Sequence, residues 1–202
     1  MKLYVARHGQ TQWNLENRVS GRTDIPLTEL GLKQAGMLAE EASGLELDLI
    51  IASPLLRAQQ TAAVVAKRCE IPMITDERLI EHDFGCFEGC LRTDPEFRAI
   101  RKNLAFRYPG GESSFDVAAR VYSLLDEIRI TCADKNVLLV CHGALARVLR
   151  TYFVDMTNEE FGAFMTDNCK CVLYETEDGS HGNRAGRDGE ETAICSEEKR
   201  LF

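Results

Sequence analysis

The sequence predicts an α/β fold with a largely parallel sheet and helices on both faces. Short apolar runs alternate along the chain with longer stretches of helical periodicity, as in successive strand-helix-strand units. Two of the runs, DLIIA at 48–52 and VLLV at 137–140, are apolar without interruption, as expected for strands covered on both sides. A chain of 202 residues fits one domain, so we expect a single α/β domain over 1–202.

The elements follow in order. The runs that predict strands are LYVA at 3–6, DLIIA at 48–52, PMIT at 72–75, NVLLV at 136–140 and CVLYET at 171–176. Helical stretches are TELGLKQAGMLAEEA at 28–42, PLLRAQQTAAVVAKR at 54–68, residues 113–131, and one directly after the fourth run.

Capping residues mark several helix starts. Ser53 and Pro54 read as an N-cap followed by proline at the first helical position, which places Arg57 at the fourth. Thr157 and Glu160 have the spacing of a capping box. Serine caps also open the stretch from 113, whose predicted core-facing stripe is Phe115, Ala118, Val121, Leu125 and Ile128.

Two regions break the alternation. Residues 82–112 are rich in aromatic and basic side chains and end in Pro-Gly-Gly, which predicts a lid inserted over one edge of the sheet. From 177 to 202 the composition becomes polar, so we expect a C-terminal extension with a flexible loop and a late strand at 192–195.

Composition limits the partners. With 24 basic and 32 acidic residues the net charge is −8, which disfavours nucleic acid and anionic lipid, so any anion site must be local. No apolar run approaches the roughly 20 residues of a membrane span, and the first residues lack an apolar signal core. The eight cysteines are scattered, which favours a cytoplasmic protein. Cys169 and Cys171 lie close together in an apparent strand, but no second pair has zinc-site spacing, so we expect small core residues.

Charged and imidazole side chains follow three of the predicted strands. Arg7 and His8 follow the first, Arg57 lies one turn after the second, and His142 follows the fourth. Ligands of parallel sheets gather at these carboxyl ends, so the groups can converge. Each histidine is followed by a glycine, at positions 9 and 143, which permits close backbone approach to a ligand.

Two cations and two imidazoles suit a dianionic phosphate monoester. A cation near a helix N-terminus, as at Arg57, is unfavourable until an anion binds there. A neutral imidazole held by its other nitrogen is a competent nucleophile toward phosphorus. Glu81, Asp83 and Glu88 are the candidate proton donors for the leaving oxygen, and the sequence around them does not distinguish among the three. His82 and His181 are expected to be structural or exposed.

Six motifs in order resemble the histidine phosphatase superfamily, the phosphoglycerate mutase-like proteins. They are RHGQTQWNLENRVSG at 7–21, LTELGLKQA, SPLLRAQQTA, LIEHDFGCFEG, PGGES and VCHGALARVL, and the resemblance covers about residues 3–154. It implies a three-layer α/β/α fold, no metal and no cofactor. By position it implies that His8 is the phosphorylated nucleophile and that Glu81 is acid and then base. It further implies a phosphoryl group held by Arg7, Asn14, Arg57 and His142, with Ser20 and Gly21 near the substrate.

Departures from the family pattern bear on the reaction. Position 10 is Gln where the family often has Glu, and Phe84 stands where the mutases have tyrosine. The lid is also shorter than the mutases' insertion. We therefore predict a phosphatase acting on a small phosphorylated metabolite rather than a phosphoglycerate mutase-type enzyme.

Three alternatives stay open. Cys141 and Arg147 have the spacing of cysteine-dependent phosphatases, although the loop between them lacks glycine and hydroxyl residues. A non-catalytic phosphate-binding module would use the same scaffold. A homodimer through a sheet edge is an open option for the oligomeric state.

Overall fold

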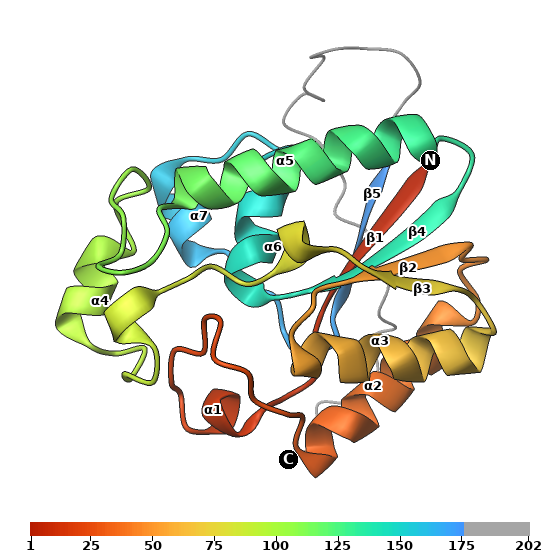
Figure 1. Ribbon diagram of the computed structural model, residues 1–202, viewed down its shortest axis with the longest axis horizontal. Helices are drawn as coiled ribbons and strands as arrows, with labels where there is room; N and C mark the ends of the chain where they lie inside the picture. Colours follow the sequence, from red (N-terminus) through yellow and green to blue (C-terminus); the bar gives the residue numbers. More distant parts are fainter. Residues whose placement is uncertain (176–202) are drawn as a thin grey trace.

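The computed structural model describes residues 1–175 and contains a five-stranded sheet between two layers of helices (Figure 1). The strand order is β3-β2-β4-β1-β5, with β5 antiparallel to β1 and the other pairs parallel. The strands are β1 Lys2–Arg7, β2 Leu49–Ala52, β3 Met73–Thr75, β4 Asn136–Cys141 and β5 Cys171–Glu175. The predicted α/β class with a mostly parallel sheet is confirmed.

Helices cover both faces of the sheet. On one face α2 and α3 pack over an apolar core, and on the other α5, α6 and α7 pack over a second core (Figure 1). The helices are α1 Gln12–Leu15, α2 Glu29–Ala42, α3 Leu56–Cys69, α4 Pro95–Ile100, α5 Ser114–Thr131, α6 Gly143–Arg150 and α7 Asn158–Ala163; the short 3-10 turns η1 and η2 are Glu77–Leu79 and Gly85–Phe87. The three-layer α/β/α arrangement is thereby confirmed.

The central strand β4 lies between β1 and β2, so three carboxyl ends meet in one place. The backbone N–H groups of His8 and Ser53 donate to the carbonyls of Cys141 and Val140, both at 3.0 Å. The residues that follow β1 and β2 are therefore hydrogen-bonded to the end of β4, where His142 is the N-cap of α6. Strand register alone brings the three predicted positions together.

The start of α3 differs from the prediction. Its N-cap is Leu55 rather than Ser53, so the helix begins two residues later and Arg57 occupies the second helical position. The Ser53 hydroxyl lies 2.6 Å from Nε2 of His142. Ser53 and Pro54 lead into a bend before α3, and the Ser53 hydroxyl bonds to His142 and accepts from the N–H of Leu55 at 3.3 Å instead of capping the helix.

The buried stripe of α5 also differs in part. Ser113 is the N-cap, as the predicted serine cap requires, and forms a capping box with Asp116, but Phe115 is 61% exposed. Phe115 lies two residues before Val117, which is buried, and two residues correspond to a rotation of about 200° around an α-helix. The true stripe runs from Val117, so Phe115 falls on the solvent face. The predicted capping box at Thr157 is confirmed in α7.

Residues 82–112 form the predicted lid beside the sheet (Figure 1). Its buried side chains pack against one another, with the Phe84 and Tyr108 rings edge to face at a centroid distance of 5.0 Å. These aromatic side chains and one valine form a cluster separate from the two cores on the sheet. It consists of Val19, Phe84, Phe87, Phe97 and Tyr108. The lid therefore has its own apolar anchor, which supports the short helix α4.

A close backbone contact joins the loop after β1 to the start of α2. A Cβ at Gly31 would collide with the backbone carbonyl of Gln10, whereas a Cβ at Gly36 in the same helix would meet nothing within 4 Å. We expect G31A to lower the free energy of unfolding by about 1 to 3 kcal/mol through overpacking. The matched variant G36A should raise it by about 0.5 to 1 kcal/mol through helix propensity. Urea unfolding of both variants checks this, and equal effects would contradict the contact.

Some predictions fall beyond the described residues. The polar extension at 177–202, the strand at 192–195 and His181 lie outside residues 1–175. Within residues 1–175, no helix has the length and apolar content that crossing a membrane requires.

Candidate active site

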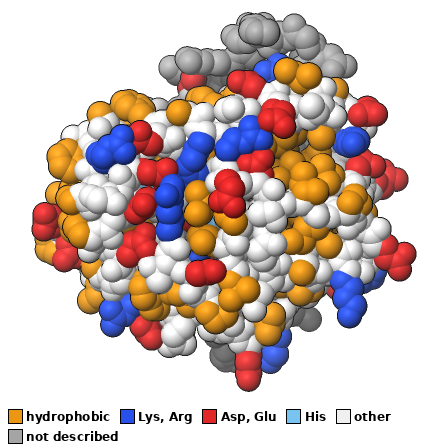
Figure 2. All heavy atoms as spheres, viewed as in Figure 1, with side chains coloured by type: hydrophobic (Ala, Val, Ile, Leu, Met, Phe, Trp, Pro, Cys, Tyr) orange, Lys and Arg blue, Asp and Glu red, His pale blue; other side chains and the backbone are white. Residues whose placement is uncertain are grey.

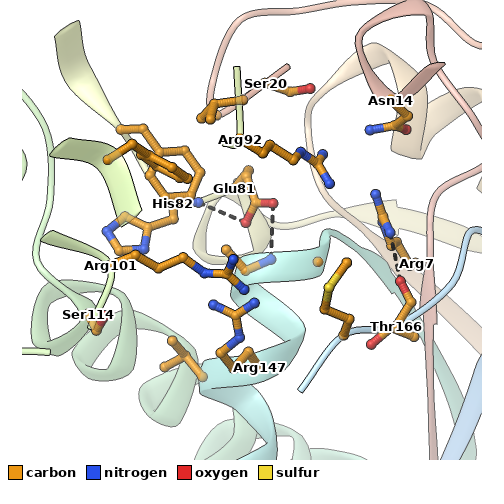
Figure 3. A pocket seen from close by; sticks show the side chains of 18 of the residues that line it. Arg7, Asn14, Ser20, Glu81, His82, Arg92, Arg101, Ser114, Arg147 and Thr166 are labelled. Carbon is orange, nitrogen blue, oxygen red and sulfur yellow. Dashed lines mark hydrogen bonds between the residues drawn. The ribbon is translucent and has the colours of Figure 1, made fainter. Parts of the chain in front are cut away.

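A pocket of about 270 Å³ opens at the carboxyl ends of the parallel strands, between the sheet and the lid (Figure 3). Its wall includes eight of the nine residues that the sequence analysis nominated, namely Arg7, His8, Asn14, Ser20, Gly21, Arg57, Glu81 and Gly143. The ninth, His142, is fully buried directly behind His8, with the two ring centroids 5.2 Å apart. The fold thus gathers all nine positions at one place.

His8 is held with one ring nitrogen unprotonated. Nδ1 lies 2.7 Å from the carbonyl oxygen of Gly9, and because a carbonyl only accepts, Nδ1 carries the proton. Nε2 then has the lone pair and accepts a hydrogen bond from Nε of Arg57 at 3.3 Å. Burial, followed by the charges of Arg57 and Arg7, holds the pKa of His8 well below its usual value. The ring is neutral at physiological pH.

Arg57 is fully buried and forms no ion pair with any described carboxylate. Its terminal nitrogens donate to the carbonyls of Gly21 at 2.6 Å and Thr23 at 2.9 Å, which aim the guanidinium at His8. Burial lowers its pKa, although a guanidinium remains charged at neutral pH. A buried cation without a counterion is costly, and a bound anion would remove that cost.

Arg7 supplies a second cation of the same kind. One terminal nitrogen donates to the carbonyl of Thr166 at 2.6 Å, while its Nε has no partner among the described residues. Burial lowers its pKa to about 10, so it stays charged. Arg7 and Arg57 together place beside His8 two positive charges that form no ion pair with a described carboxylate, which makes this end of the pocket a candidate anion site.

His142 is neutral in the ligand-free site. Burial, then the charge of Arg57, holds its pKa well below the usual value. Nε2 bonds to Ser53, and Nδ1 has no partner among the described residues. Two nearby guanidinium groups and a dry environment both oppose a third positive charge on this ring in the free protein.

Glu81 is fixed at the start of α6. Oε1 accepts from the N–H groups of His82 at 3.0 Å and Leu145 at 2.9 Å, and Oε2 from that of Ala144 at 3.2 Å. The N-cap residue of α6, His142, makes no capping bond with its side chain. The carboxylate of Glu81 therefore takes over that role and is held rigidly at the pocket wall (Figure 3).

The carboxylates of Glu88 and Asp83, the other two candidate acids, accept hydrogen bonds from the backbone of the surrounding loops. Glu88 accepts from the N–H groups of Arg22 at 2.7 Å and Thr23 at 2.8 Å, and Asp83 accepts from that of Gly85 at 2.9 Å. Neither carboxylate lines the pocket. The structure thus separates three acids that the sequence left equivalent.

Two residues near the pocket escaped sequence reasoning. The Asn168 amide donates to the His8 carbonyl at 2.8 Å and to the Asn14 side chain at 3.3 Å, and the Thr166 carbonyl holds Arg7. Both stand in the loop between α7 and β5, which returns to β1 from about 160 residues away in the sequence. No local motif marks them, because only the antiparallel pairing of β5 brings this loop to the site.

Comparison with known proteins identifies the family. The model of the histidine phosphatase superfamily (branch 1) matches residues 3–185. The chain belongs to this superfamily. The "Probable phosphoglycerate mutase GpmB" of Yersinia pestis is 37% identical over 159 residues, covering 75% of this chain and 74% of that protein.

Solved structures point the same way. A mycobacterial glucosyl-3-phosphoglycerate phosphatase in complex with VO3 has a TM-score of 0.78 at 31% identity, covering 85% of this chain and 90% of that one. An α-ribazole phosphatase of Shigella flexneri has a TM-score of 0.76 at 27% identity, covering 88% and 92%. Membership and relatives together support a phosphatase or mutase activity for this histidine phosphatase superfamily member.

The geometry does not support Cys141 as the nucleophile of a cysteine-dependent phosphatase. Cys141 is fully buried, does not line the pocket, and burial raises the pKa of its thiol to about 12. A thiolate nucleophile needs exposure and a lowered pKa. Cys169 lies in a turn before β5 rather than in the strand, with a φ of 57°, while Cys171 is buried in the core beneath α2.

Gln10 lies outside the pocket of this histidine phosphatase superfamily member. Its side-chain oxygen accepts from the Thr28 hydroxyl at 3.0 Å, and it does not line the cavity. The departure from the family's glutamate therefore changes a contact between the β1 loop and α2 and leaves the phosphate end intact.

The two neutral histidines give this histidine phosphatase superfamily member a characteristic acid response. Below pH about 6.5 the unfolded chain takes up protons that folded His8 and His142 refuse, so the free energy of unfolding falls as the pH drops. Each ring contributes a slope of up to about 1.4 kcal/mol per pH unit. Urea unfolding between pH 7 and pH 5 measures how the free energy of unfolding changes with pH. H8N should lower this slope by the contribution of one histidine ring. A slope unchanged in that variant would contradict a neutral His8.

Proposed function

We propose that the protein hydrolyses small phosphate monoesters through a phosphohistidine on His8. One observation carries the proposal: the Nε2 lone pair of His8 lies 3.3 Å from Nε of a fully buried arginine that has no carboxylate partner among the described residues. A nucleophile and a dianion site in contact suit phosphoryl transfer, in which positioning and charge stabilisation supply most of the acceleration.

In the first step Nε2 of His8 attacks phosphorus. The P–N bond forms as the ester P–O bond breaks, and its electron pair leaves with the alcohol oxygen, which takes a proton from the Glu81 carboxyl group. Arg7, Arg57 and Asn14 hold the phosphoryl oxygens. His142, neutral in the free protein, contributes a ring nitrogen and becomes cationic only after the dianion has entered.

In the second step water replaces the alcohol. Its oxygen attacks phosphorus while Glu81 takes its proton, and the P–N bond breaks with its electron pair returning to Nε2 of His8. Inorganic phosphate leaves, and both residues recover their starting states. The cycle uses side chains alone, so we propose that activity needs neither a metal nor a cofactor and survives EDTA.

A phosphoglycerate mutase-type transfer is the second candidate. The name of the Yersinia pestis relative favours it. The compact lid and Phe84, which packs against Tyr108 instead of offering a hydroxyl, favour hydrolysis. In a mutase a hydroxyl group of the bound phosphoglycerate, in place of water, would attack the phosphohistidine and take its phosphoryl group.

The partners remain predictions from the sequence. Figure 2 shows acidic and basic side chains intermixed over one face of the molecule, with no broad basic area on that face. This distribution agrees with a small phosphorylated metabolite as partner and offers no footprint for nucleic acid on that face. A cytoplasmic location and a homodimer are likewise predictions.

A panel of phosphorylated metabolites tests the function. We expect phosphate release from several monoesters in the presence of EDTA, and no interconversion of 2- and 3-phosphoglycerate at a comparable rate. A mutase rate well above the rate of phosphate release would favour the second candidate. Tight vanadate binding without turnover of any ester would indicate a non-catalytic phosphate-binding module.

A further inference from the structure

Asn14 lies on an element that apolar packing does not fix. Helix α1 has four residues, and none of them is buried. A helix this short is not stable by itself in water, so polar contacts determine where its side chains point. Asn14 nevertheless lines the pocket, and Figure 3 shows it on the same side of Glu81 as Arg7. Its hydrogen bonds therefore decide which atoms it can offer to a ligand.

A backbone group fixes the orientation of the Asn14 amide. The N–H of Thr11 donates to the Asn14 side chain at 3.1 Å. Because a backbone N–H only donates, the atom that it contacts is the side-chain oxygen Oδ1. The side-chain nitrogen Nδ2 lies on the other branch of the amide and donates to no residue in the described part of the chain. Its two N–H groups are thus available to a phosphoryl oxygen.

Asn168 donates to the same oxygen from a distant part of the chain. Its Nδ2 lies 2.8 Å from the carbonyl oxygen of His8 and 3.3 Å from Oδ1 of Asn14. Both of these oxygens only accept, so the identity of the Asn168 nitrogen is fixed as well. Asn168 does not line the pocket. It contacts the backbone of the nucleophile and the amide of a phosphate-site residue from behind the pocket wall.

The segment 166–170 is hydrogen-bonded to the end of β1 on both sides of this asparagine. The carbonyl of Thr166 accepts from the Arg7 side chain at 2.6 Å. The N–H of Cys169 donates to the Arg7 carbonyl at 2.9 Å, and the Arg7 N–H donates to the carbonyl of Lys170 at 3.4 Å. The side chain at position 168 is therefore held at a defined place relative to the end of β1.

We propose that Asn168 is a positioning residue, which holds Oδ1 of Asn14 together with the Thr11 N–H and so keeps Nδ2 of Asn14 directed at the phosphoryl group. This inference rests on the proposed function. Without Asn168, Oδ1 keeps a single donor, and the amide can rotate to present its oxygen to the phosphoryl oxygens. An oxygen there accepts but cannot donate, so the charge-assisted hydrogen bond to the anion is lost.

A double-mutant cycle tests the positioning role. Asn14→Ala should lower the affinity for inorganic phosphate and kcat/KM for p-nitrophenyl phosphate about 10- to 100-fold, because it removes a charge-assisted hydrogen bond. Asn168→Ala should lower both about 5- to 20-fold. In the Asn14→Ala background the same change at position 168 should lower them about twofold or less, since no amide remains to be oriented. Calorimetry measures the phosphate affinity, and steady-state hydrolysis measures kcat/KM.

Two further variants control the comparison. Asn158→Ala is the matched control, because Asn158 is exposed at the first residue of α7 and does not line the pocket. Its phosphate affinity and kcat/KM should stay within about twofold of the wild-type values. Asn168→Leu has a side chain of similar size that cannot donate, so it should match Asn168→Ala. Urea unfolding of each variant separates a loss of stability from a loss of binding.

Two results would overturn the inference. One is an equal effect of Asn168→Ala in the wild-type and Asn14→Ala backgrounds, because residue 168 would then support the fold without acting through Asn14. The other is an unchanged phosphate affinity in folded Asn168→Ala protein. The binding measurement does not depend on turnover. Coupling between the two asparagines in phosphate affinity, without turnover of any ester, would support the positioning role and contradict the proposed phosphatase function.

Discussion

Replacing His8 by alanine is expected to lower kcat by about 10⁴-fold or more, because the nucleophile itself is removed. Arg7 and Arg57 remain in H8A, so vanadate and inorganic phosphate should still bind. The measurement is steady-state hydrolysis of p-nitrophenyl phosphate, with phosphate binding followed by calorimetry. Loss of turnover with binding retained separates a missing nucleophile from a collapsed pocket.

Cys141→Ser is the control for the rival nucleophile. Cys141 is fully buried at the end of β4, so its replacement is expected to affect stability more than turnover. A folded C141S protein should keep its kcat within a few-fold of the wild-type value. A folded C141S protein without activity, beside an active H8A protein, would reverse the assignment.

Replacing Glu81 by glutamine is the second large effect. Proton transfer by a positioned side chain contributes about 10²- to 10⁴-fold, so E81Q should lose activity in that range toward alkyl phosphates. The loss should be smaller for p-nitrophenyl phosphate in the first step, because nitrophenolate leaves without a proton. Water attack still needs the base, so phosphorylated protein should accumulate. Stopped-flow release of nitrophenol would then show a burst followed by a slow steady state.

Glu88→Gln is the matched control for this effect. Its carboxylate binds the backbone of the loop after Ser20 and does not line the pocket. E88Q should show no burst and the same dependence on leaving group as the wild type. If E88Q and E81Q share the burst, the effect belongs to the loop and Glu81 is not the acid.

Much of the candidate site could be predicted from the sequence because the end of a strand is recognised from its own residues. Arg7, His8 and His142 stand directly after apolar runs, and parallel strands deliver such residues to one edge whatever the details of packing. Arg57 follows for a similar reason, as a cation in the first turn of a helix that needs an anion.

Other parts of the site depend on tertiary contacts that no spacing reveals. Ser53 looks like an N-cap in the sequence, but its hydroxyl bonds to a histidine 89 residues away. Asn168 reaches His8 from the far end of the described chain. The choice of Glu81 over Glu88 depends on the position of α6, whose N-terminal amides hold only the first carboxylate.

The most direct test of the account is the chemical identity of the covalent intermediate. The protein would be mixed with ³²P-labelled ester, quenched within milliseconds, and digested for peptide mapping by mass spectrometry. The account predicts label on His8 that is lost in acid and retained in base. Label on Cys141, or the absence of any phosphorylated protein during rapid turnover, would contradict it.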